Sequence, residues 1–244
     1  YAPIVVLIVL SFNDGRHAAN WEGFSFRWYA KLMENKLLIK SVKNSLLIAG
    51  ATTVLSTIVG TLAALALARF SFRGKGGTQA LLFLPIIIPE IVLGAALVTF
   101  FGTVEMRLSI WTVILAHMVF TVSYVAIVVR ARLSGFDRSL EEAAMDLGAG
   151  PLETFFRVTF PLILPGVVAG ALLVFTLSID DYVITSFVAG VGSTTLPLQI
   201  YSMIKVGVTP EVNAVSTLLL LLTIIMIVFA QRLQQAPGEP GEKK

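Results

Sequence analysis

Long apolar stretches alternate with short polar ones along almost the whole chain. Five stretches are long enough to cross about 30 Å of hydrocarbon as helices, and they lie at about 44–68, 79–102, 109–129, 161–179 and 212–230. A sixth stretch, residues 1–12, is apolar but too short to span. Because the chain begins without Met, we expect this stretch to be the remainder of a truncated first span rather than the tail of a signal peptide. The pattern predicts an all-α, polytopic membrane protein with about six transmembrane helices.

The composition supports the membrane assignment. Hydrophobic residues make up 56% of the chain, charged residues 14%, and the mean hydropathy is +0.86, which is far from an ordinary soluble domain. Cysteine is absent, which excludes disulfides, thiol catalysis and cysteine-based metal sites. The formal net charge of +3 is better explained by membrane orientation than by nucleic-acid binding.

The distribution of Lys and Arg predicts the orientation. The short loops 69–75 and 130–157 are basic, whereas 103–108 and 180–211 are not. Most of the Lys and Arg residues on the other side of the membrane lie in the single loop 13–43. Since basic loops stay on the cytoplasmic side, this bias places the segment 130–157 in the cytoplasm. An even number of spans then puts both termini there as well.

A short polar segment interrupts the apolar pattern at residues 139–149. Ser139 followed by Glu142 is the spacing of a capping box, and Gly148 is typical of a helix end. Pro151 is suited to open a second short helix that ends near Thr159, before Pro161.

One face of this short helix is apolar, and its residues are spaced at i, i+3, i+4 and i+7: Leu140, Ala143, Ala144 and Leu147. The alanines leave room for close approach of another protein, and three acids remain for hydrogen bonds or ion pairs: Glu141, Glu142 and Asp146. The segment is therefore either a docking helix for a partner or a solvated connector without one.

Ionisable residues inside apolar stretches are costly, so each is a functional candidate. Glu90 follows Pro89 in the stretch 79–102, and Ser178, Asp180 and Asp181 lie at the end of the stretch 161–179. Pro89, together with Pro85, can break or kink the helix. Carboxylates along a pathway suit a polyammonium substrate and repel an anion. The alternatives are an ion pair for Glu90 and a helix end at interfacial water for the two aspartates, whose side chains point about 100° apart in a helix.

Several other features are weaker candidates for a functional site. Trp28 lies in an amphipathic segment before the second span and is either a pathway residue or an interfacial anchor. His117 is expected to be structural, and the run 74–78 lacks the GxxxxGK[ST] pattern of a phosphate loop. We find no catalytic, metal-binding or dinucleotide motif, so we expect no cofactor on this chain and ATP binding on another.

The polar segment resembles the cytoplasmic signature loop of the permease subunits of type I ABC importers. The resemblance rests on residues 141–144, 146–149, 160–162 and 165–166. Further stretches resemble the polyamine branch, in particular the second permease subunit of spermidine/putrescine importers: residues 44–46, 73–75, 175–181 and 196–203. Together these stretches extend over most of the chain.

The resemblance implies a bacterial inner-membrane permease, with a permease domain at 1–235 and a disordered cytoplasmic tail at 236–244. It implies no enzyme activity in this chain. The expected partners are a second permease subunit, two ATP-binding cassette subunits that use ATP and Mg²⁺, and an extracytoplasmic binding protein. The coupling helix that docks on the ATPase corresponds to Glu141, Glu142, Ala143, Ala144, Asp146, Leu147, Gly148 and Ala149.

Three other functions fit parts of the pattern. A permease for another small solute would share the signature loop. A stand-alone channel or secondary transporter would use the same buried acids, but it needs no docking helix, and no inverted repeat is evident. An intramembrane aspartyl enzyme needs two carboxylates from different helices, whereas Asp180 and Asp181 are adjacent in the chain.

Overall fold

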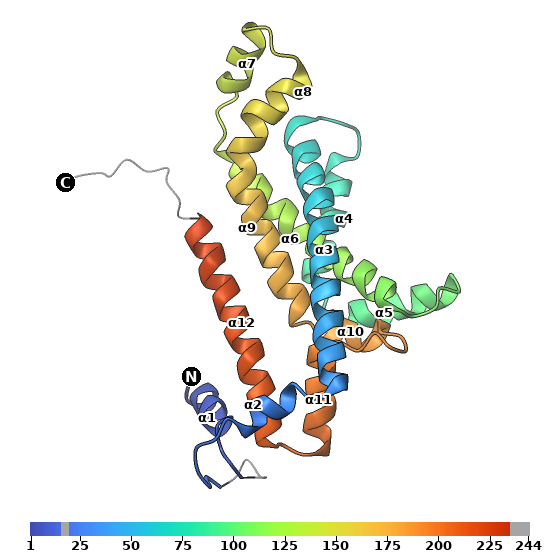
Figure 1. Cartoon of the computed structure of the whole chain (residues 1–244). Coiled ribbons are helices and arrows are strands. Elements are labelled where there is room, and N and C mark those ends of the chain that lie inside the picture. The colour runs from blue at the N-terminus through green and yellow to red at the C-terminus, as the bar shows by residue number, and fades with distance from the viewer. Residues whose placement is uncertain (16–19, 235–244) are drawn as a thin grey trace, which may run out of the picture.

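The computed structural model describes residues 1–15 and 20–234, and these residues are almost entirely helical (Figure 1). The helices are α1 (Ala2–Leu10), α2 (Arg27–Leu32), α3 (Lys36–Arg69), α4 (Lys75–Ile87), α5 (Glu90–Thr103), α6 (Ile110–Ser134), α7 (Ser139–Asp146), α8 (Pro151–Thr154), α9 (Phe160–Ile179), α10 (Val183–Val188), α11 (Leu196–Val206) and α12 (Pro210–Gln234). A π-helical turn, Phe155–Thr159, joins α8 to α9. Within the described part of the chain, extended segments pair only in one isolated bridge, Asn13 with Phe24. The predicted all-α fold is confirmed.

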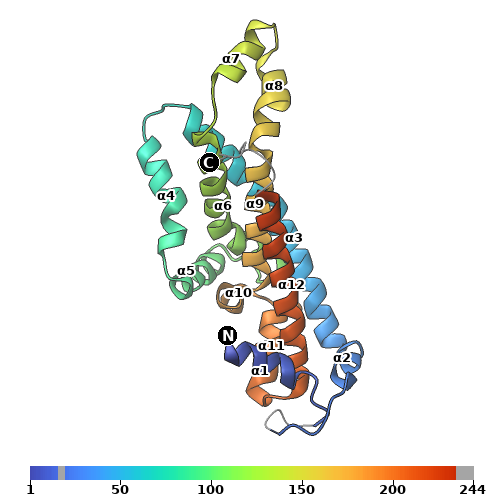
Figure 2. The same cartoon turned by 90° about the vertical axis from the view of Figure 1, so that its left-hand side faces the viewer.

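The long helices α3, α6 and α9 pack along one another and form the centre of the molecule (Figures 1 and 2). Their buried side chains are mostly small or β-branched, among them Ala64, Val125 and Ile163. Gly60 of α3 lies so close to α6 that a Cβ there would be 2.6 Å from the Cβ of Val125. Small residues at such crossings let membrane helices approach closely.

Four helical segments in the described range are long and apolar enough to cross a membrane, and the pair α4 and α5 makes a fifth if counted as one span. The pair is bent by 111° between Ile87 and Glu90, so the predicted stretch 79–102 is not one straight helix. The bend comes at Ile88, whose ψ of 130° is extended, because a residue before proline is disfavoured in helical geometry. Pro85, the other proline of the stretch, is accommodated inside α4.

The span predicted at 161–179 begins earlier than the sequence suggests. The helix opened by Pro151 does not end near Thr159 but continues through the π-turn into α9, which gives one span from Pro151 to Ile179. Pro161 removes a backbone N–H and crowds the carbonyl four residues before it, that of Arg157. That carbonyl lies in the wider π-turn, where the helix tolerates the proline.

The two ends of the described chain lie in opposite halves of the molecule (Figure 1). The nine residues of α1 are about 14 Å long at 1.5 Å per residue, less than half the thickness of the hydrocarbon layer. Tyr1 therefore stays in the half opposite α7, whereas α12 runs toward the α7 half. The common side predicted for both termini stays a prediction. The predicted tail 236–244 lies outside the described residues.

Candidate functional site

The helix α7 projects from one end of the molecule, beyond α3, α6 and α9 (Figures 1 and 2). Its start differs from the predicted capping box: the N-cap residue is Arg138, with no capping side chain, and Ser139 is already helical. Asp137 takes the capping role, since its carboxylate accepts a hydrogen bond of 2.9 Å from the backbone N–H of Ser139. This bond from the backbone, with one from the Ser139 side chain, lowers the pKa of Asp137.

The end of α7 is as predicted. Gly148 has φ +92°, a left-handed conformation that glycine adopts at little cost. Its N–H donates to the carbonyl of Met145 over 2.9 Å, and the N–H of Ala149 donates to the carbonyl of Ala144 over 3.1 Å. This pair of bonds is a Schellman motif, which turns the chain sharply toward α8.

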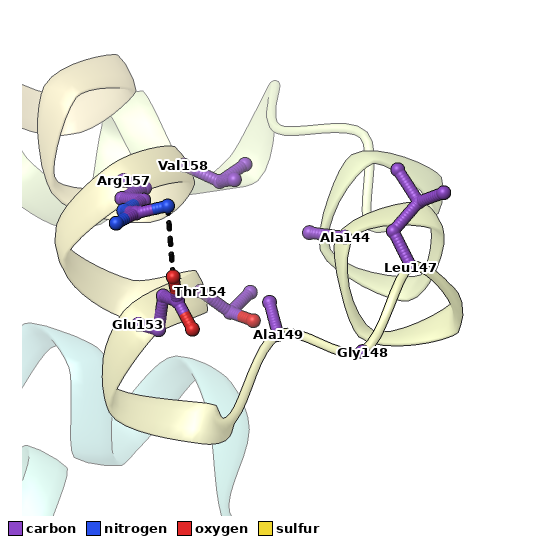
Figure 3. Close-up of a pocket in the computed structure, with 8 residues that line it drawn as sticks. All are labelled: Ala144, Leu147, Gly148, Ala149, Glu153, Thr154, Arg157 and Val158. Atoms are coloured by element: carbon purple, nitrogen blue, oxygen red, sulfur yellow. Dashed lines mark ion pairs between the residues drawn. The ribbon is translucent and has the colours of Figure 1, made fainter.

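The predicted apolar face of α7 is largely uncovered. Leu147 is 90% exposed, and Leu140 and Met145 are about half exposed. Between α7 and α8 lies a hollow of about 410 Å³, bordered by Ala144, Leu147, Gly148, Ala149, Glu153, Thr154, Arg157 and Val158 (Figure 3). Its α8 side carries an ion pair of 2.8 Å between Glu153 and Arg157. The end of the molecule therefore offers a hollow beside exposed apolar side chains.

The two adjacent glutamates of α7 face different surroundings. Glu142 and Asp146 are exposed. The side chain of Glu141 is 15% exposed and forms an ion pair with Arg69 at the end of α3. It also accepts a hydrogen bond from the hydroxyl of Thr159. Glu141 thus points into the molecule, away from the exposed face of α7.

The two aspartates that follow α9 also have different surroundings. The carboxylate of Asp181 lies 3.2 Å from Nε2 of His117 and accepts hydrogen bonds from the N–H and hydroxyl of Thr185, over 2.8 and 2.7 Å. Ser178 completes this cluster, with its hydroxyl 2.7 Å from Nδ1 of His117. His117 is fully buried. The cluster therefore links α6, α9 and α10 by hydrogen bonds inside the molecule.

Asp180 instead borders a separate cavity of about 410 Å³. The cavity is lined by Asp180, Tyr182, Pro197, Ile200, Tyr201, Ile204, Ser216, Leu219, Leu220 and Thr223. The rings of Tyr182 and Tyr201 lie 4.5 Å apart. Glu90, the first residue of α5, is exposed and is not among the residues that line this cavity. Carboxylates beside aromatic rings are the groups that attract an organic cation.

Trp28 does not reach this cavity. It is 5% exposed, its indole N–H donates to the carbonyl of Asn13 over 2.8 Å, and it packs in a cluster with Leu196 and Val212. In the described conformation Trp28 is a packing residue, and its role in the pathway stays a prediction.

Sequence reasoning missed His117 as the partner of Asp181, the two tyrosines beside Asp180 and the contact of Glu141 with Arg69. His117, Tyr201 and Arg69 each come from another helix, and no local spacing in the sequence points to them. Tyr182 lies only two residues after Asp180, so its place beside that aspartate could have been read from the sequence. The described residues contain no group of three or more His, Asp and Glu side chains suited to hold a metal.

The family is decided by comparison with known proteins. Residues 56–236 match the model of the binding-protein-dependent transport system inner membrane component. The chain belongs to this family. Two relatives are the spermidine/putrescine transport system permease protein PotC of Haemophilus influenzae, 44% identical over 95% of this chain and 90% of its own length, and PotC of Escherichia coli K12, 42% identical over 100% and 93%. The putrescine transport system permease protein PotI of Escherichia coli K12 is 43% identical over 90% of this permease and 81% of its own length.

Solved structures support the fold. The permease superposes with a TM-score of 0.77 and 15% identity on a bacterial ABC transporter involved in the import of the acidic polysaccharide alginate, over 98% of this chain and 90% of the other. The methionine ABC transporter MetNI gives a TM-score of 0.64 at 19% identity, over 88% and 100%. The predicted type I importer permease fold and the multi-pass inner-membrane location are thus confirmed.

Proposed function

We propose that this permease is one half of the translocation pathway of an ATP-driven importer of polyamines, putrescine or spermidine. The supporting observation is the cavity that Asp180 lines together with Tyr182 and Tyr201. The relatives named above carry polyamine transport in their names, whereas the alginate importer is similar in fold alone.

The chemistry of the cavity suits an ammonium group. A cation that leaves water needs a countercharge, which Asp180 supplies. The tyrosines add aromatic surface to the cavity wall, and the Tyr201 ring already contacts an ammonium group, that of Lys205, 4.8 Å from the ring centroid. Asp181 is engaged with His117, so it holds the start of α10 in place and Asp180 meets the substrate. A single carboxylate with aromatic neighbours binds weakly enough to release its cargo, as a conduit requires.

The exposed face of α7 and the hollow beside it are the docking site for an ATP-binding cassette subunit. Ala143 and Ala144 allow close approach, Leu147 supplies apolar area, and Glu142 and Asp146 supply hydrogen-bond acceptors. Two such subunits bind and hydrolyse ATP with Mg²⁺, and this chain carries no cofactor of its own. Closure of the ATPase dimer moves α7, and the movement passes to the spans.

The remaining partners complete the assembly. A second permease chain supplies the other half of the pathway, and an extracytoplasmic binding protein delivers the substrate at the end that carries α1, α2 and α11. The α7 end faces the cytoplasm, in accord with its basic residues: Arg69, Arg73, Lys75, Arg130, Arg132 and Arg138. Both termini of the whole protein lie on that side, and lipid surrounds the exposed apolar faces.

The test is uptake by the assembled transporter, with its candidate partners, in vesicles. Asp180→Asn keeps the size of the side chain and removes its charge, so ATP-dependent uptake of labelled putrescine and spermidine should fall at least about tenfold, as expected for the loss of a charge-assisted contact. Glu105→Gln, which replaces an exposed acid away from the cavity, should leave uptake unchanged. Equal uptake by native and Asp180→Asn transporters would contradict the role of the cavity.

A further inference from the structure

The contact of Glu141 with Arg69 and Thr159 joins three elements at the cytoplasmic end. Arg69 is the last residue of α3, Glu141 is the third residue of α7, and Thr159 is the last residue of the π-turn that leads into α9. Besides its ion pair with Glu141, Arg69 donates a hydrogen bond of 3.2 Å to the hydroxyl of Thr159. The three side chains therefore form a closed triangle, which we call the Arg69–Glu141–Thr159 junction.

The junction is more sheltered than an ordinary surface ion pair. Thr159 is fully buried, and the side chains of Glu141 and Arg69 are 15% and 32% exposed. Partly buried pairs with additional hydrogen bonds are screened less by water and salt than exposed pairs. Next to it, the guanidinium of Arg138 donates to the carbonyl of Ala68 over 3.4 Å, a second link between the start of α7 and the end of α3.

The position of the junction connects α7 to both ends of the pathway. α3 has 34 residues, about 51 Å of helix at 1.5 Å per residue, and it extends from Arg69 to the opposite end of the molecule. There its N-cap residue Asn35 donates to Glu211 of α12 over 3.2 Å. α9 extends from the π-turn to Ser178 and Asp180. α7 also lies against α8 and the π-turn, and the short connections 135–138 and 147–150 join it to α6 and α8.

We infer that Glu141 is a positioning residue that passes displacement of α7 directly to α3 and α9 through the Arg69–Glu141–Thr159 junction. The two adjacent glutamates then have different roles. Glu142 contacts the ATPase subunit, and Glu141 holds α7 to α3 and α9 inside the permease. This inference rests on the proposed docking of an ATPase at α7. It predicts a variant that still docks and hydrolyses ATP but transports poorly.

The first test compares uptake with ATP hydrolysis in the assembled transporter. Glu141→Gln should lower the polyamine taken up per ATP hydrolysed by about tenfold, the effect expected when a hydrogen-bonded ionic contact is lost. Co-purification of the ATPase subunits should be unchanged. Glu142→Gln, the matched control, should instead reduce that co-purification. The charge-exchanged pair Arg69→Glu with Glu141→Arg should recover part of the lost uptake, which a fold defect at either site would not allow.

The second test measures movement without reference to the substrate. Because the chain has no cysteine, spin labels can be placed at Ser139→Cys on α7 and Phe70→Cys beside Arg69, both exposed sites. In the native junction the distance between the labels should stay the same when ATP is added to the complex. In Glu141→Gln it should change with ATP, because α7 then moves without α3.

Either of two results would overturn the inference but not the proposed docking. One is an unchanged uptake per ATP in Glu141→Gln, and the other is a label distance that responds to ATP equally in the native permease and in Glu141→Gln. Failure of the ATPase subunits to associate with the native permease would contradict the proposed docking, and the inference with it. Association with transport of a different solute would contradict only the substrate, since the label distances still test the junction.

Discussion

At the residue scale, Gly148 is the position where backbone geometry limits the docking segment. A Cβ there would meet nothing within 4 Å, so the cost of Gly148→Ala comes from φ +92° alone, about 1 kcal/mol. We expect this variant to loosen the turn between α7 and α8 and to lower both the Tm of the complex and ATP-driven uptake. Gly150→Ala is the control, since it also has open space but a φ of −72° that any residue adopts. Equal effects of the two substitutions would contradict this account.

Asp180 and Asp181 should respond differently to the same change. Asp181→Asn weakens the contact with His117 and the cap of α10, so it should destabilise the permease by about 1–3 kcal/mol, seen as a lower Tm in detergent. Asp180→Asn should leave the Tm near its native value while uptake falls. The same loss of Tm in both variants would assign both aspartates to the fold.

The sequence identifies several important residues but not their contact partners on other helices. The cost of an ionisable group in an apolar stretch identifies Asp181 as important, but its partner His117 lies 64 residues away on another helix. Glu141 and Arg69 are 72 residues apart. The capping box failed for a local reason: the carboxylate of Asp137 accepts the N–H of Ser139, the bond that a capping box assigns to Glu142. Gly148 was predictable, because its role depends only on its own backbone.

At the element scale, the break between α4 and α5 positions Glu90. Pro89→Ala removes the restriction on Ile88 and lets the helix continue, which would change the direction in which Glu90 points. Uptake should fall severalfold, and spin labels on α4 and α5 should report a straighter pair. Pro85→Ala lies where the chain is already helical and should have little effect on the angle. An unchanged angle in Pro89→Ala would show that packing, rather than the proline, sets the bend.

The five long apolar stretches all contain membrane helices, because hydrocarbon thickness sets a minimum length that any sequence must satisfy. Their ends were less predictable. The sequence alone does not tell whether a proline such as Pro161 ends a helix or is accommodated, since this depends on the π-turn before it.

At the scale of the whole molecule, docking depends on exposed apolar area at the α7 end. Leu147→Glu should weaken co-purification of the ATPase subunits roughly ten- to hundredfold, because a leucine contributes about 1.5–3 kcal/mol when it is buried at an interface. Val191→Glu replaces an equally exposed side chain in the loop between α10 and α11 and should leave co-purification unchanged. Loss of the ATPase in both variants would indicate a general effect of the added charge.

The central claim is that this permease moves a polycation under the control of ATP. The most direct measurement is uptake by vesicles that contain the native transporter with its candidate partners, supplied in parallel with labelled putrescine, labelled spermidine, a neutral sugar and sulfate. The account predicts ATP-dependent uptake of the polyamines and none of the sugar or the anion. ATP-dependent uptake of the sugar or the anion alone would contradict the role given to Asp180 and its cavity.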